Sequence, residues 1–153
     1  MKEKIPVVGR GFHFEDLAVG CRFRTHRRTL AEADLAQFVN LTWLTEELFA
    51  VADDSGRVIK GRPVPAALVY SFAEGLLLPS MQETGLAFLN ATLDVKGPTF
   101  VGDTIHVECE VVEHRLTSKG DRGLVRFANR VLTQRGETVL EYNPLRLLKR
   151  APA

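Results

Sequence analysis

Apolar and polar residues alternate along most of the chain after residue 85, which is typical of half-buried antiparallel strands. In one segment, Ile105, Val107, Cys109 and Val111 are apolar and the residues between them are polar. Turn-forming residues such as Gly97-Pro98 and Arg135-Gly136 separate the alternating segments. The pattern therefore predicts strands over residues 89–96, 104–111, about 123–133 and about 137–148. A shorter strand with polar edges is expected over residues 21–28.

The first half of the chain has the spacing of helices. Thr29 is a candidate N-cap because Glu32 follows three positions later, as in a capping box, and apolar residues then recur every three or four positions. A second helix is predicted from Pro65 to Pro79, and it is apolar in almost every direction. A helix without a polar face belongs in the middle of a fold. Its polar groups are Tyr70 and Glu74.

These elements predict an α+β fold in which an antiparallel sheet wraps round one long central helix. The length of 153 residues fits a single domain, 1–153, and residues 1–20 are expected to form an N-terminal arm. One short sheet around one helix leaves edge strands exposed. Such edges commonly pair with a second copy, so a homodimer is expected.

The composition excludes several classes of protein. Twenty basic and nineteen acidic residues leave a net charge of +1, which argues against nucleic-acid binding. Cys21 and Cys109 have no metal-ligand spacing and are expected to be free thiols, so no metal site is predicted. No apolar run is long enough for a membrane span, and residues 1–11 do not have the pattern of a signal peptide. A cytoplasmic protein without membrane contact is therefore expected.

Five segments of the sequence resemble segments of a known protein family and occur in the same order. The chain resembles a single-domain member of the MaoC-like acyl-thioester hydratase/dehydratase family, whose fold is the hotdog fold. That resemblance implies an acyl-CoA or acyl-carrier-protein thioester as the partner and no cofactor. The similar phrases are Phe14–Gly20, Arg28–Thr42, Gly61–Leu77, Val95–Val107 and Asn129–Glu141.

The hydratase motif of that family can be laid over residues 41–55 without a gap. The motif reads approximately Leu-Thr-Gly-Asp-x-Asn-Pro-Ile-His, and this chain retains its leucine and threonine. The family's Asp and His form the catalytic dyad, which shares the attacking water. Here Trp43 replaces the glycine, Leu44 the aspartate, Glu46 and Glu47 the Asn-Pro pair, and Phe49 the histidine. Leucine and phenylalanine carry no titratable proton, so the usual general acid and base are absent from these positions.

The resemblance also indicates which residues would form a site. The free N–H groups at the start of the central helix could hold a thioester carbonyl. Carboxylates or a hydroxyl that could substitute for the dyad belong to Glu46, Glu47, Glu74 and Tyr70. The expected substrate-binding residues are Trp43, Leu44, Phe49, Pro63, Ala66, Ala67 and Tyr70.

The resemblance leaves three functions open, and whether the chain is an enzyme stays open with them. It could be an (R)-specific enoyl-CoA hydratase or 3-hydroxyacyl dehydratase with substitute acids. It could be an inactive thioester-binding module or the partner subunit of an active paralogue. A thioesterase would need a carboxylate near the central helix, for which Glu74 is the candidate. Glu74 itself must either find a buried partner or lie at the rim of a dimer.

Overall fold

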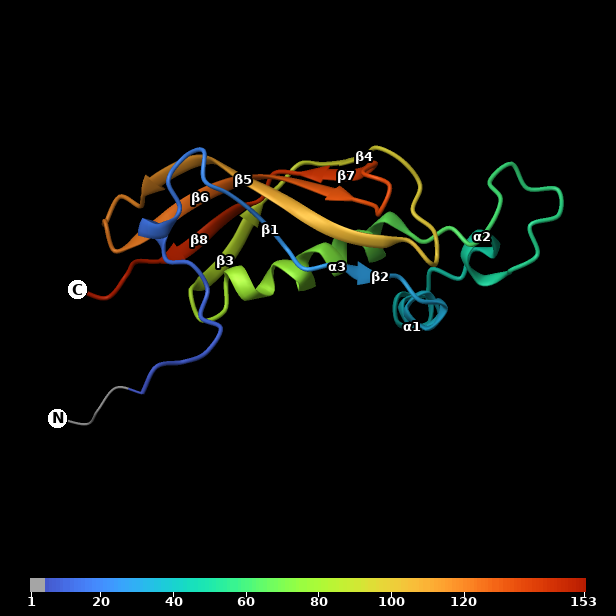
Figure 1. Cartoon of the computed structure of the whole chain (residues 1–153), viewed down its shortest axis with the longest axis horizontal. Helices are drawn as coiled ribbons and strands as arrows, with labels where there is room; N and C mark the ends of the chain where they lie inside the picture. Colours follow the sequence, from blue (N-terminus) through green and yellow to red (C-terminus); the bar gives the residue numbers. More distant parts are fainter. Residues whose placement is uncertain (1–4) are drawn as a thin grey trace.

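The computed structural model describes residues 5–153 and places one sheet along the central helix α3 (Ala66–Leu77) (Figure 1). Two shorter helices, α1 (Glu32–Thr42) and α2 (Glu47–Ala50), lie beyond the N-terminal end of α3 (Figure 1). Two 3-10 turns are η1 (Phe14–Asp16) and η2 (Leu78–Ser80). The strands are β1 (Arg22–Arg24), β2 (Arg28–Thr29), β3 (Gly85–Asn90), β4 (Leu93–Val95), β5 (Thr104–Leu116), β6 (Arg122–Leu132), β7 (Thr138–Tyr142) and β8 (Leu145–Lys149).

Every strand pairing is antiparallel, as the alternating pattern predicts. β5 and β6 form the long centre of the sheet, and β1 and β2 both pair with β5. β6 pairs with β7 along one part and with β8 along another. β4 and β3 then pair with β7 and β8 and form the outer edge.

The single strand expected over 137–148 is two strands, because the ladder is interrupted at Asn143-Pro144. Proline has no N–H to donate to a neighbouring strand. The Pro144 carbonyl still accepts the Phe127 N–H at 3.1 Å, so β7 and β8 remain neighbours of the same strand, β6. The prediction of one continuous strand over 137–148 was therefore wrong.

The prediction that Thr29 caps the first helix was wrong. Thr29 lies in β2, where its hydroxyl is 2.7 Å from that of Thr104. The N-cap of α1 is Ala31, and the Asp34 carboxylate accepts its N–H at 2.8 Å. A carboxylate at the third helical position therefore satisfies the backbone that Thr29 was expected to reach.

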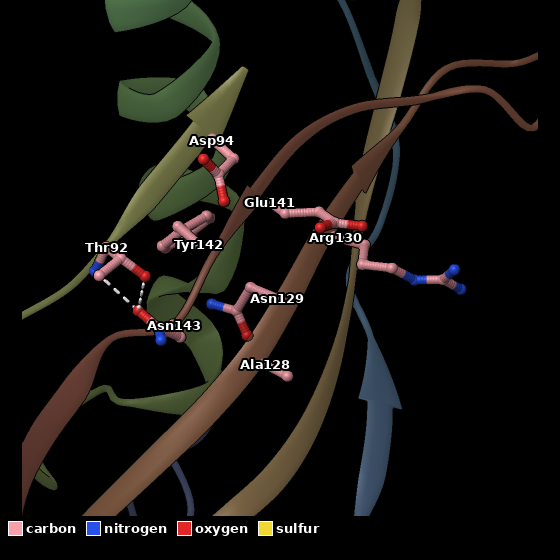
Figure 2. Close-up of a pocket in the computed structure, with 8 residues that line it drawn as sticks. All are labelled: Thr92, Asp94, Ala128, Asn129, Arg130, Glu141, Tyr142 and Asn143. Atoms are coloured by element: carbon pink, nitrogen blue, oxygen red, sulfur yellow. Dashed lines mark hydrogen bonds between the residues drawn. The ribbon is translucent and has the colours of Figure 1, made fainter. Parts of the chain in front are cut away.

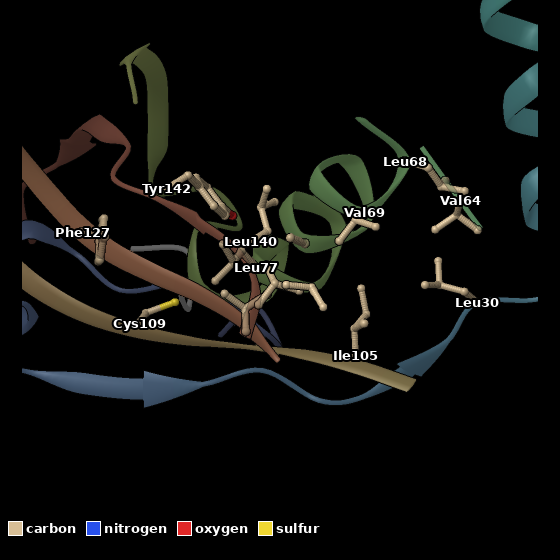
Figure 3. Packing of buried hydrophobic residues seen from close by; sticks show 14 of the residues in the cluster. Leu30, Val64, Leu68, Val69, Leu77, Ile105, Cys109, Phe127, Leu140 and Tyr142 are labelled. Carbon is tan, nitrogen blue, oxygen red and sulfur yellow. The ribbon is translucent and has the colours of Figure 1, made fainter. Parts of the chain in front are cut away.

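The hydrophobic core lies between α3 and the inner face of the sheet (Figure 3). α3 contributes Leu68, Val69, Ala73 and Leu77, and β5 and β6 contribute alternate apolar residues. Ala67, Ser71 and Gly75 are exposed on the other side of α3. The expectation that this helix is buried in every direction therefore does not hold within one chain.

The segment before β1 is fixed to the β5–β6 hairpin by a stacked pair of rings. The Phe14 and His114 rings lie 3.7 Å apart, and the His114 Nε2 is 2.9 Å from the Phe14 carbonyl oxygen. Phe14 also lies over Gly123, where an added Cβ would come within 1.9 Å of the ring. Part of the predicted arm is therefore packed against the sheet, because β6 has no side chain at this position.

A Gly123→Ala substitution is expected to lower the free energy of unfolding by about 1–3 kcal/mol, as overpacking does. The reason is that Phe14 must leave its stacked position to admit the methyl group. Urea unfolding measures the change. Gly75→Ala is the matched control, since no atom lies within 4 Å of a Cβ there and alanine favours a helix. Equal stability of the two variants would contradict this packing.

Both cysteines are free, as expected. Burial raises the pKa of the Cys109 thiol to about 12. Within residues 5–153, none of the helices combines the length and the apolar character that a membrane span needs.

Candidate functional site

At the end of α1 the backbone adopts a conformation that favours glycine, and glycine is the residue that the hydratase motif has at this position. Trp43 is the C-cap of α1 and is left-handed, with φ 62° and ψ 22°. Glycine is the usual residue at such a position, and a bulky side chain there is uncommon. Trp43 occupies the motif's glycine position, so this conformation supports the alignment with the motif. The Trp43 side chain is 85% exposed.

Leu44 and Phe49, which replace the family's aspartate and histidine, lie on either side of the start of α2. Leu44 is 38% exposed. Phe49 is half-buried and packs against the hydrophobic core. Arg57 holds this segment in place, because its Nη2 donates to the carbonyl oxygens of Glu47 and Val51 at 3.1 and 2.8 Å.

Glu46 and Glu47 are exposed and do not converge on another chemical group. Glu46 is the N-cap of α2, and its carbonyl oxygen accepts the N–H groups of Phe49 and Ala50. Neither carboxylate forms an ion pair with a residue in 5–153. Both carboxylates are therefore solvated, and no neighbouring group positions either of them to replace the dyad.

The chain before α3 is held as a short strand against residues 99–101. Pro63 forms a bridge with Phe100, and the Val64 N–H donates to the Thr99 carbonyl at 2.9 Å. Arg62 connects this lead-in to α1, because its Nη2 lies 2.6 Å from Oε1 of Glu32. The start of α3 thus has a fixed position close to α1.

A buried carboxylate organises the turn that supports this lead-in. Asp103 accepts hydrogen bonds from the Phe100 N–H, from Gln134 Nε2 and from Arg135 Nη1, at 2.9, 3.0 and 2.9 Å. Burial acts to raise the pKa of Asp103, but the bonds from Arg135, Phe100 and Gln134 outweigh it and lower the pKa. Asp103, which belongs to the similar segment Val95–Val107, therefore has a structural role.

Asp103→Asn is expected to cost about 1–3 kcal/mol of unfolding free energy at neutral pH, as the loss of a buried charged hydrogen-bond partner does. Because the folded-state pKa is lowered, the stability contributed by the carboxylate is fully present above its unfolded pKa of about 3.9. It is lost as the pH falls through the folded pKa. Urea unfolding from pH 7 to pH 2 should show the wild type and variant converging in acid. A constant difference would contradict this account.

An apolar cavity of 110 Å³ lies between the start of α3 and the ends of β4 and β7. Ala66 is the predicted site residue that lines it. The N–H groups of Ala66 and Ala67 have no acceptor among residues 5–153, whereas those of Leu68 and Val69 both donate to the Pro65 carbonyl. The first two N–H groups of α3 are therefore available to a ligand. The cavity is lined by Val64, Ala66, Val69, Val95, Gly97, Pro98, Thr99, Val139 and Leu140.

Glu74 is occupied by two partners on the inner face of the sheet. Arg146 donates to both of its carboxylate oxygens, with Nη1 3.0 Å from Oε2, and the Tyr142 hydroxyl donates to Oε1 at 2.9 Å. Arg146 is 5% exposed. The sequence left two possibilities for Glu74, a buried partner or a position at the rim of a dimer. The structure shows a buried partner, Arg146.

Tyr70 packs the edge of its ring against Tyr142, with the centroids 5.1 Å apart. Burial and the nearby Glu74 carboxylate raise the pKa of Tyr70, so its hydroxyl stays protonated at neutral pH. Tyr70 and Glu74 thus belong to one polar cluster with Tyr142 and Arg146. This cluster forms no part of the lining of the 110 Å³ cavity.

Sequence reasoning missed Arg146 and most of the cavity. Arg146 stands in the apolar run Leu145–Leu148, and a charged residue inside a buried strand is the signal that could have identified the partner of Glu74. The walls of the cavity come from three separate segments, near residues 64–69, 95–99 and 139–140. The structure does not place Trp43, Leu44 or Phe49 in the lining of this cavity.

A second hollow, of 270 Å³, lies over β4, β6 and β7 and contains none of the predicted site residues (Figure 2). Its lining includes the charged residues Asp94, Arg130 and Glu141. The hydroxyl and N–H of Thr92 donate to Asn143 Oδ1, both at 2.7 Å, and Glu141 forms an ion pair with Lys96.

No family model matches the sequence, and no curated protein matches it either. Solved structures do match. The monoamine oxidase regulatory protein of Archaeoglobus fulgidus is 26% identical, with a TM-score of 0.83 over 94% of this chain and 97% of that chain. The MaoC-like dehydratase of Rhodospirillum rubrum is 24% identical, with a TM-score of 0.82 over 94% and 100%.

An (R)-hydratase of Pseudomonas aeruginosa is 24% identical, with a TM-score of 0.77 over 92% of this chain and 88% of that chain. These likenesses confirm the hotdog fold predicted from the sequence. The chain is structurally similar to MaoC-like dehydratases and (R)-hydratases, and the resemblance stated from its phrases is confirmed at that level.

Proposed function

We propose that this hotdog chain binds the acyl group of an acyl-CoA or acyl-carrier-protein thioester and does not hydrate it by the mechanism of MaoC-like enzymes. The observation that carries the proposal is an apolar cavity whose lining includes Ala66, the residue that carries the first unpaired N–H group of α3. A thioester has an apolar chain on one side of a carbonyl. The cavity suits the chain, and the N–H groups suit the carbonyl oxygen.

The chemical argument against hydration rests on the residues available. Addition of water to a 2-enoyl thioester needs a base for the water and an acid for the adjacent carbon. Leu44 and Phe49 supply neither. Glu74 is held by Arg146 and Tyr142, and Tyr70 has a raised pKa. Binding without hydration is the function that these groups support best.

The same network argues against a thioesterase. Such an enzyme would need the Glu74 carboxylate as a base or nucleophile. Both oxygens of Glu74 already accept hydrogen bonds, and Arg146 has no other carboxylate partner among residues 5–153. A carboxylate held on both oxygens by Arg146 and Tyr142 is not positioned to attack a thioester.

A homodimer is part of the proposal. β3 and β4 each pair with one strand among the described residues, which leaves the outer edge of the sheet open. Apolar side chains on this edge are exposed, and the uncovered side of α3 is exposed as well. A second copy would cover both surfaces. The exposed residues of the edge are Leu86, Phe88, Leu89, Leu93 and Val95.

Thermal unfolding with butyryl-CoA tests binding, because a ligand selective for the folded state raises the apparent Tm. At 100 times Kd, the stabilisation is expected to be about 2.7 kcal/mol. CoA without an acyl group is the control and should stabilise less. Equal effects of CoA and butyryl-CoA would refute an acyl site. Release of free thiol during the incubation would instead support a thioesterase.

A further inference from the structure

We infer that the cavity beside α3 selects short acyl chains, with about four carbons as the best fit. This inference rests on the proposed function, since it specifies the ligand of the same site. It depends on the volume of the cavity, on the packing of its walls and on the presence of Ala66 in its lining.

The volume sets the length of the chain. An engineered protein cavity of about 150 Å³ accommodates benzene, which has six carbons. The cavity beside α3 has 110 Å³, so it has room for roughly four carbons. Each methylene buried there should improve the affinity about fourfold, which corresponds to about 0.8 kcal/mol. A longer chain finds no further space.

The walls limit any extension of the cavity. Val69, Val139 and Leu140 are almost completely buried and belong to the hydrophobic core. Protein interiors are close-packed, so these side chains cannot move apart without strain. Val69 comes from α3, and Val139 and Leu140 come from β7, so the cavity lies between the helix and the sheet. Figure 3 shows Val69 and Leu140 on these two elements.

The unpaired N–H group of Ala66 indicates where the thioester carbonyl binds. Ala66 belongs to the lining and also carries one of the two unpaired N–H groups. A carbonyl oxygen bound there would direct the acyl chain towards Val69 and Leu140. The chain would therefore enter the cavity from its Ala66 side.

The test is a series of acetyl-, butyryl-, hexanoyl- and octanoyl-CoA, with Kd measured by calorimetry. For the wild type, the affinity should rise roughly 16-fold from acetyl to butyryl and then stop rising or fall. Leu140→Ala, which removes one wall, should move the optimum to hexanoyl- or octanoyl-CoA. Val69→Ala is the second variant and should shift the optimum in the same direction.

Leu68→Ala is the matched control, because Leu68 is equally buried but does not line the cavity. It should lose stability and keep the preference for butyryl-CoA. An affinity that rises continuously to octanoyl-CoA in the wild type would overturn the inferred preference for about four carbons. It would leave the proposed function intact. If neither these CoA esters nor the same acyl groups on an acyl-carrier protein bind, the proposed function itself is refuted.

Discussion

Replacing Glu74 with alanine is expected to lower the free energy of unfolding by about 3–5 kcal/mol. The loss is large because the buried guanidinium of Arg146 would lose its counter-charge, and an uncompensated buried charge costs that much. Tyr142 would also lose the acceptor of its hydroxyl. Urea unfolding at pH 7 measures the change.

Two further variants separate the buried pair from ordinary surface pairs. Glu74→Ala combined with Arg146→Met removes both charges and should recover much of the loss, since an apolar replacement of a buried pair is often tolerated. Glu113→Ala breaks the more exposed pair with Arg126 and should have a much smaller effect. If Glu74→Ala lowers the free energy of unfolding no more than Glu113→Ala does, then the contacts of Glu74 with Arg146 and Tyr142 do not stabilise the fold as described.

The second large effect is a gain of activity. Leu44→Asp combined with Phe49→His is expected to accelerate hydration of a short 2-enoyl-CoA by about 10²–10⁴-fold over the wild type, the contribution typical of a positioned acid or base. The left-handed conformation of Trp43, at the glycine position of the hydratase motif, supports the alignment on which this variant is based. Loss of the enoyl absorbance with time measures the rate.

A pair outside that register provides the control. Val8 and Leu116 are exposed and lie outside residues 41–55, so Val8→Asp with Leu116→His should fold normally and gain no activity. Circular dichroism and the unfolding midpoint confirm folding for both double variants. A folded Leu44→Asp/Phe49→His variant without any gain would count against the alignment with the hydratase motif.

Much of the fold could be predicted because its signals are local. The period of two in β5 and the apolar character of α3 follow from residues that are neighbours in the sequence. The errors occurred where a neighbouring residue changed the backbone hydrogen bonds that the pattern predicts. Asp34 rather than Thr29 supplies the capping contact of α1, and Pro144 divides the last strand. Both are effects of single residues on backbone hydrogen bonds.

The site was less predictable, because its geometry depends on contacts between distant residues. Sequence reasoning could name Ala66 and Ala67, since the start of a helix always leaves N–H groups free. It could not foresee that Val69 and Leu140, from separate elements, would leave a cavity between them. Nor could it choose a partner for Glu74, because Arg146 lies 72 positions further along the chain.

The central claim is that this chain binds an acyl thioester at a place where no side chain can transfer the proton needed for hydration. The most direct test is the hydration rate of crotonyl-CoA by the wild-type protein, at a concentration where thermal unfolding shows the site to be saturated. The rate should equal that of the uncatalysed reaction. Turnover that disappears in Glu46→Gln or Glu47→Gln would contradict the claim, because one of these exposed carboxylates would then have replaced the missing pair.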